Sequence, residues 1–85
     1  MNTQQDDIYH ILREALVNLF EIDATLIRPE ADLYTDLDID SIDAIDLMDH
    51  IKRETGHKLL AEDFRNVRTV QDVVQAVWQK MQAAG

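Results

Sequence analysis

Apolar residues recur at helical spacing in three separate stretches of this 85-residue chain, and that periodicity constrains the fold more than any other feature. In residues 4–20 the stripe consists of Ile8, Ile11, Leu12, Ala15, Leu16 and Leu19. Near the other end, Thr69 stands in a capping position before a second stripe, which consists of Val70, Val73, Val74, Val77, Trp78 and Met81. Amphipathic helices of this kind must bury their apolar faces against one another.

The third periodic stretch, residues 41–54, is predicted to be a helix with a core side made of Ala44, Leu47, Met48 and Ile51. Lys52 and Arg53 fall in its last turn, where the helix dipole favours positive charge. Gly56 suits the position just after the helix, because glycine readily adopts the left-handed backbone that often follows a C-terminus. We therefore expect this helix to stop before Gly56.

Residues 21–39 show no sustained periodicity, and Pro29 forbids a continuous helix there. We expect a long loop with one short helical turn near residues 33–37, packed down by its own apolar side chains Ile22, Leu26, Ile27, Leu33, Leu37 and Ile39. A brief helix is expected at residues 61–66, with Phe64 facing inward. The predicted fold is an all-α, small four-helix bundle, with three longer helices, one short helix and a long loop between the first and second helices.

Ser41 stands at the predicted start of the second helix. Asp40 can cap that helix by accepting hydrogen bonds from its free amides, and Asp43 supplies the acid that completes a capping box. Ser41 then falls in the first turn, where its side chain points outward and the helix dipole favours an attached anion. An Asp-Ser pair at a helix start is by itself consistent with ordinary capping.

Composition narrows the classes of function. The chain has no cysteine, so any reactive thiol must come from a cofactor. A net charge of −9 argues against nucleic acid or anionic membrane as a direct partner, and no apolar run approaches membrane-spanning length. The polar, acidic opening is not a targeting segment, so we expect a cytoplasmic protein. With 46% hydrophobic residues at regular spacing, the acidity does not indicate disorder.

The pattern Leu33-x-x-Asp36-Leu37-x-x-Asp40-Ser41-Ile42-Asp43, followed by Asp46-Leu47, resembles the attachment site of acyl carrier proteins. The likeness extends without gaps from about Ile22 to Val77 and includes the helix start at Thr69. Three positions depart from the family pattern. Asp38 stands where glycine is frequent, Ile42 where leucine is usual, and Asp49 where a methionine is usual in the partner-binding helix.

The resemblance implies that residues 1–85 form a single acyl carrier domain that catalyses nothing itself. A phosphopantetheinyl transferase would move phosphopantetheine from coenzyme A onto Ser41, using a magnesium ion, and Asp40 would flank the site as the helix cap. Acyl chains would then be held as thioesters for a ketosynthase, an acyl ligase or acyltransferase, and other chain-modifying enzymes. The implied setting is a freestanding carrier, monomeric outside enzyme complexes, in a fatty acid, polyketide or related lipid pathway, including aryl polyene-type pathways.

Ile42 and Ile45 lie off the core side of the second helix, inside a patch of acids, and an exposed apolar pair usually has a partner. We predict that a partner-binding face is formed by Asp36, Asp38, Ile42, Asp43, Ile45, Asp46 and Asp49. The alternative interpretation of these acids is a merely solvated helix face.

Other interpretations compete with the acyl carrier assignment. An aminoacyl or peptidyl carrier would usually have glycine and histidine before the serine, and here the residues are Ile39 and Asp40. The chain could also be an unmodified helical interaction module. Asp36-x-Asp38-x-Asp40 imitates the opening of a calcium loop but lacks the glycine and glutamate that such a loop requires, so we predict no metal site. His10, His50 and His57 are predicted to be surface residues, and Met48, Phe64 and Trp78 core residues.

Overall fold

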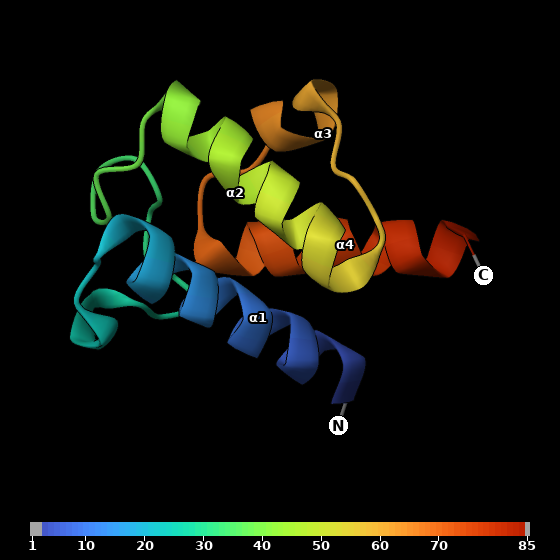
Figure 1. The fold of residues 1–85 in the computed structure, drawn as a ribbon, viewed down its shortest axis with the longest axis horizontal. Helices are drawn as coiled ribbons and strands as arrows, with labels where there is room; N and C mark the ends of the chain where they lie inside the picture. Colours follow the sequence, from blue (N-terminus) through green and yellow to red (C-terminus); the bar gives the residue numbers. More distant parts are fainter. Residues whose placement is uncertain (1–2, 85) are drawn as a thin grey trace.

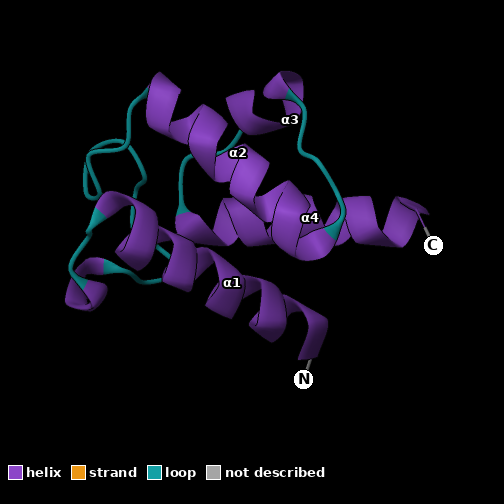
Figure 2. Cartoon of the chain, viewed as in Figure 1, coloured by secondary structure: helices purple, strands orange, loops and turns teal. Residues whose placement is uncertain are grey.

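The computed structural model describes residues 3–84, apart from the side chains at positions 3, 4, 61 and 84. Along the chain lie α1 (Thr3–Phe20), a single 3-10 turn η1 (Ala24–Leu26), α2 (Ser41–Thr55), α3 (Ala61–Arg65) and α4 (Val70–Ala84) (Figures 1 and 2). Three longer helices, one short helix and the long connection between α1 and α2 confirm the predicted fold class. Only η1 was not predicted.

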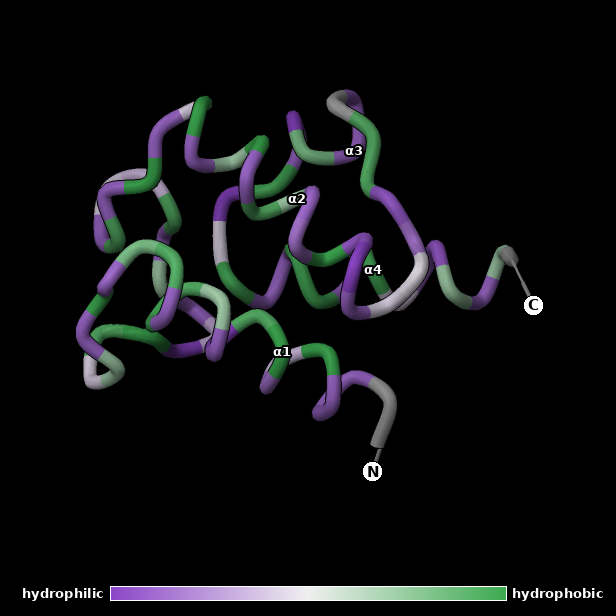
Figure 3. Tube along the Cα trace, viewed as in Figure 1, coloured by the Kyte–Doolittle hydropathy of each residue, from purple (hydrophilic) through white to green (hydrophobic). Residues whose placement is uncertain are grey.

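α1 packs against both α2 and α4, and α3 packs against α4. In Figure 1 the long connection emerges from the end of α1 and leads to the start of α2. Along the long helices, apolar and polar positions alternate in Figure 3, as helices with one buried face require. Residues 21–40 run across one end of the bundle in Figure 1 and lead to the first residue of α2.

The core confirms most of the predicted stripes. Its buried members from the three longer helices are Ile8, Leu12, Ala15, Leu16, Ala44, Leu47, Ile51, Val70, Val73, Val74 and Val77. Met48, Trp78 and Met81 are only partly buried and pack against this core, whereas Phe64 from α3 is buried as predicted. Ile11 is only partly buried, and the prediction is wrong for Leu19, which is 47% exposed.

The loop residues are mostly packed as expected. Ile27, Leu33, Leu37 and Ile39 are buried and Ile22 is partly buried. Leu26 is the exception, since it lies in η1 and remains 50% exposed. The predicted turn near residues 33–37 is present as backbone hydrogen bonds from the amides of Asp36 and Leu37 to the carbonyl of Asp32, at 3.0 and 3.1 Å.

Left-handed backbone marks two helix ends and the turn before α2. Gly56 follows α2 at φ 77°, as predicted. Glu21 follows α1 at φ 55°, and the amide of Ile22 closes that end on the carbonyl of Leu16 at 3.3 Å. Asp38, which stands where glycine is frequent in related proteins, has φ 58°, a conformation that aspartate tolerates better than most residues. Both non-glycine residues adopt a conformation that L-residues disfavour.

Candidate functional site

Ser41 is the first residue of α2, and the capping box predicted around it is present. The Asp43 amide donates to Asp40 Oδ1 at 2.8 Å, and the Asp40 amide donates to Asp43 Oδ2 at 3.4 Å. The two reciprocal bonds fix the first turn of the helix. Because Ser41 lies inside this box but takes no side-chain part in it, the box would remain if the hydroxyl were removed.

The Ser41 side chain is exposed, and among the described residues its hydroxyl has no hydrogen-bond partner. Nothing in this part of the chain therefore activates the hydroxyl as a nucleophile or blocks access to it. The site lies at the N-terminus of a 15-residue helix, where free amides and the helix dipole favour negative charge. An exposed hydroxyl in such a place suits covalent attachment of an anionic group by an outside enzyme.

The turn before Ser41 brings several predicted site residues close to it. Asp38 adopts the left-handed conformation and is exposed. Asp36 is also exposed, but its Oδ2 accepts a hydrogen bond from the Asp32 amide at 2.8 Å. One carboxylate oxygen of Asp36 is thus engaged in a hydrogen bond within the loop, whereas the Asp38 carboxylate makes no hydrogen bond within the described part of the chain.

The apolar residues predicted to face solvent on α2 do so. Ile42 is 70% exposed and Ile45 is 61% exposed. Ile45 lines a groove of about 410 Å³ between α2 and the segment that leads to α3. The groove's apolar residues are Ile45, Met48, Leu59 and Leu60, and its charged ones are Asp46, Asp49 and Lys58. Sequence reasoning missed Leu60, which is 47% exposed, although a bulky apolar residue just before a five-residue helix was a usable signal.

Asp46 and Asp49 also line a smaller groove of about 280 Å³ on the other side of α2, with Leu19, Phe20, His50 and Arg53. Asp49 Oδ2 lies 3.5 Å from Arg53 Nη2, and both side chains are largely exposed. Asp46 and Asp49 therefore form a ridge between the two grooves. The contribution of the end of α1 to this surface was not predicted from the sequence.

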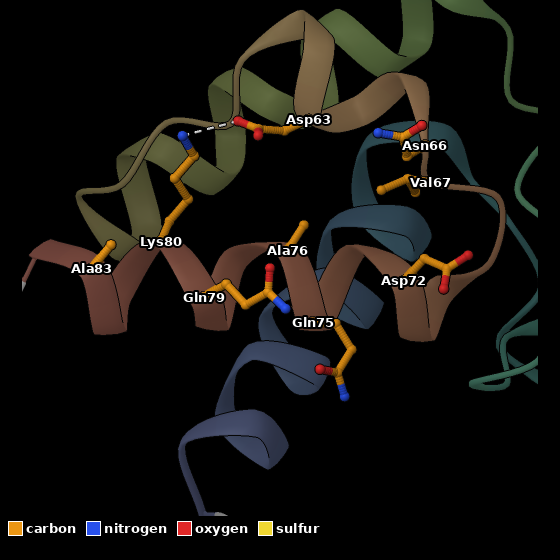
Figure 4. Close-up of a pocket in the computed structure, with 9 residues that line it drawn as sticks. All are labelled: Asp63, Asn66, Val67, Asp72, Gln75, Ala76, Gln79, Lys80 and Ala83. Carbon is orange, nitrogen blue, oxygen red and sulfur yellow. Dashed lines mark ion pairs between the residues drawn. The ribbon is translucent and has the colours of Figure 1, made fainter.

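A further groove of about 340 Å³ lies between α3 and α4 (Figure 4). Across it, Lys80 Nζ lies 3.0 Å from Asp63 Oδ2. The Leu60 amide, which donates to Asp63 at 2.9 Å, lowers the pKa of that carboxyl, and Lys80 lowers it further. No residue that lines this groove belongs to α2 or to the loop before it, so it is separate from the Ser41 site.

No group of three or more potential metal ligands occurs among the described residues. Asp36 Oδ2 and Asp40 Oδ1 each accept a hydrogen bond from a backbone amide. The absence of a calcium site in this loop stays a prediction. His10 is exposed as predicted, whereas His50 and His57 are partly buried. His50 Nε2 lies 3.9 Å from Glu54 Oε1. Within the described range, no helix is long and apolar enough to cross a membrane, and the cytoplasmic location stays a prediction.

Comparison with known proteins identifies the class to which this fold and site belong. The family model described as "Phosphopantetheine attachment site" matches residues 10–77, which include Ser41 and the capping box. The chain is 41% identical over 73 residues to acyl carrier protein 2 of Ralstonia nicotianae, covering 86% of this chain and 90% of that protein.

Two further relatives are named acyl carrier protein. The one from Coprothermobacter proteolyticus is 28% identical over 74 residues, covering 87% of this chain and 90% of that protein. The one from Thermosynechococcus vestitus is 28% identical over 79 residues, covering 93% and 98%. The chain belongs to the acyl carrier protein family, whose members are carriers and not enzymes. Its cofactor is phosphopantetheine.

Proposed function

We propose that Ser41 is the residue that carries phosphopantetheine and that the protein holds acyl groups as thioesters on the end of this arm. The observation that supports the proposal most strongly is an exposed serine hydroxyl at a capped helix start, inside the range that matches the attachment-site family. The surroundings also fit the group. The helix N-terminus favours the negative charge of a phosphodiester, and Ser41 leaves the capping box intact when it is modified.

The chain's own residues supply position and access for the loading reaction. The Ser41 Oγ would lose its proton and form a bond to phosphorus, while the pyrophosphate bond of coenzyme A breaks and adenosine 3′,5′-bisphosphate leaves. Among the described residues, no side chain forms a hydrogen bond with the hydroxyl, so we expect the phosphopantetheinyl transferase to supply the base and the magnesium ion. Asp40 and Asp43 hold the hydroxyl at a fixed helix start.

We assign partner binding to the exposed face of α2 and the turn before it. Its members are Asp36, Asp38, Ile42, Asp43, Ile45, Asp46 and Asp49. The exposed isoleucines offer apolar contact, and the surrounding carboxylates favour basic patches on a ketosynthase, an acyl ligase or acyltransferase and other chain-modifying enzymes. Docking of this kind is fast and salt-sensitive, which suits a carrier that must release its partner after each step.

The setting that we propose is a freestanding, monomeric carrier of a fatty acid, polyketide or related lipid pathway, with an aryl polyene-type pathway as one member of this class. The relatives named above support the acyl carrier class, since each is named an acyl carrier protein and the chain covers 90% or more of its length. The acid-rich run from Asp36 to Asp49, with its two exposed isoleucines, suits a partner set different from that of carriers with a methionine in place of Asp49.

The test is intact-mass measurement after incubation with coenzyme A and a broad-specificity phosphopantetheinyl transferase. We expect a gain of one phosphopantetheine unit, which depends on both coenzyme A and the transferase. An unmodified interaction module would keep its original mass. The same measurement after loading with candidate acyl or aminoacyl groups distinguishes an acyl carrier from an aminoacyl carrier.

A further inference from the structure

Asp32 is the centre of the hydrogen-bond network in the loop before Ser41. Its Oδ1 accepts from the amides of Tyr34 and Thr35, at 2.8 and 3.0 Å. Its own amide donates to Asp36 Oδ2 at 2.8 Å, and its carbonyl accepts from the amides of Asp36 and Leu37. Five hydrogen bonds therefore converge on one residue within a six-residue turn.

The same residue lies where the loop is fastened to the start of α4. Asp32 forms an isolated antiparallel bridge with Thr69. The Val70 amide donates to the Ala31 carbonyl at 3.0 Å, and the Leu33 amide donates to the Arg68 carbonyl at 2.8 Å. The side chains meet as well, because Arg68 Nε lies 3.8 Å from Asp32 Oδ2. The turn is thus anchored on both sides of Asp32.

A short path connects this anchor to Ser41. The Ile39 amide donates to the Leu33 carbonyl at 2.8 Å, which ties the residue just before the helix cap to the residue just after Asp32. Both Leu33 and Ile39 are buried, so the connection is held by packing as well as by the hydrogen bond. The amides of Thr35 and Tyr34, which donate to this carboxylate, also lower the pKa of the Asp32 carboxyl.

We propose that Asp32 is a positioning residue for the loading of Ser41: its carboxylate keeps the loop of residues 33–40 in one conformation, so that the transferase meets a preformed site. This inference rests on the proposed function of Ser41. If the loop is formed only part of the time, the transferase binds only that fraction of the carrier, and the apparent affinity falls in proportion. The chemical step on a correctly bound carrier would be unchanged.

The experiment measures steady-state loading of wild type and variants by a broad-specificity phosphopantetheinyl transferase at saturating coenzyme A, well below the lowest melting temperature. Asp32→Ala removes the carboxylate oxygen that accepts from the amides of Tyr34 and Thr35. It should raise the KM for the carrier about tenfold, with kcat within about twofold of wild type, as expected if the loop is formed in about one-tenth of the molecules. Asp32→Asn keeps a carboxamide oxygen in the acceptor position and should restore a KM close to that of wild type.

Val77→Ala is the control for general destabilisation, because Val77 is fully buried in α4 and has no part in the loop. It should lower the melting temperature and leave KM unchanged. If Asp32→Ala does not fold, Asp32→Glu replaces it, since the longer side chain keeps the charge but displaces the acceptor, and KM should rise severalfold.

A wild-type KM in Asp32→Ala, or in Asp32→Glu where that variant replaces it, would overturn the inference. The inference would also be overturned by a loss confined to kcat, by an equal rise of KM in Val77→Ala, or by a failure of Asp32→Asn to restore the wild-type KM. If wild type itself does not load, the proposed function of Ser41 fails instead, so the two failures can be distinguished.

Discussion

Asp49 Oδ2 lies 3.5 Å from Arg53 Nη2, one turn further along α2, and both side chains are largely exposed. A surface pair of this kind contributes about 0–1 kcal/mol to stability. The ion pair therefore gives no sufficient structural reason for an acid at position 49. Because Asp49 lies on the ridge between two grooves and on the same side of α2 as Ile45, its position suits contact with a partner better.

The first prediction concerns that role. Asp49→Met should change the free energy of unfolding by less than about 1 kcal/mol, since only an exposed pair is lost. It should weaken use by the cognate ketosynthase or ligase, which we expect to place an arginine or lysine opposite Asp49, and improve use by general fatty acid enzymes. Loading or elongation assays with each enzyme set, at fixed salt, measure both effects.

The matched control is Asp7→Met, which makes the same substitution at an exposed acid of α1. It should leave both enzyme sets unaffected. Full cognate activity in Asp49→Met, with no gain toward the general enzymes, would show that Asp49 is an ordinary solvated acid.

The second prediction concerns the two strained backbone positions. Glu21 and Asp38 have φ values of 55° and 58°, which glycine adopts without steric cost. Glu21→Gly should raise the free energy of unfolding by roughly 0.5–1 kcal/mol, after the greater entropy of glycine in the unfolded chain is counted, and Asp38→Gly should raise it by less, because aspartate tolerates this conformation better than glutamate does. Urea denaturation measures the change.

Glu14→Gly is the control, because it places glycine in the middle of α1, where the backbone is helical and not strained. It should lower the free energy of unfolding by about 1 kcal/mol. Destabilisation in all three variants would argue against strain at the two positions.

The third prediction is the dependence of stability on acid. The pKa of Asp32 is lowered by the amides of Thr35 and Tyr34, and the pKa of Asp23 by the amide and hydroxyl of Thr25. A carboxyl with a depressed folded-state pKa contributes stability that is present above its unfolded pKa, about 3.9, and is lost as pH falls through the folded-state pKa. The stability that these two carboxyls contribute should therefore be lost below about pH 4. In urea unfolding between pH 7 and pH 3, Asp32→Asn should show a shallower fall than wild type, and identical slopes would contradict the assignment.

The fourth prediction concerns repulsion among the acids at the start of α2 and in the turn before it. Asp36, Asp38, Asp40, Asp43, Asp46 and Asp49 all lie within 14 residues of one another, in a chain of net charge −9. Physiological salt with millimolar magnesium should screen this repulsion and raise the melting temperature, where about 5 °C corresponds to roughly 1 kcal/mol. A variant with Asp38→Asn and Asp46→Asn should respond less. A melting temperature that is independent of salt and magnesium would contradict the prediction.

Much of this structure could be predicted from the sequence, and the reason is that its determinants are local. The capping box at Asp40 and Asp43 depends on residues three apart, and the end of α2 depends on Gly56, so both are visible without knowledge of the fold. The exposure of Ile42 and Ile45 follows from their angular distance to the core stripe of the same helix.

What the sequence did not show depends on contacts between distant segments. Leu19 fits the stripe of α1 but is 47% exposed and lines a groove with residues of α2. Leu26 was expected to pack beneath the loop, but it is exposed in a 3-10 turn, which the pattern of apolar residues did not predict. Asp32 fits the general preference for an aspartate whose side chain bonds amides two and three residues on, which was a usable signal. Its attachment to α4 was not visible in the sequence.

The most direct test of the central claim is to locate the modification on the loaded protein. After incubation with coenzyme A and transferase, fragment-ion mass spectrometry of wild type should place phosphopantetheine on Ser41. Ser41→Ala should acquire none, while its free energy of unfolding should change by no more than about 1 kcal/mol because the Asp40–Asp43 capping box remains. Loading of Ser41→Ala, or phosphopantetheine on another hydroxyl of the wild-type chain, would contradict the account.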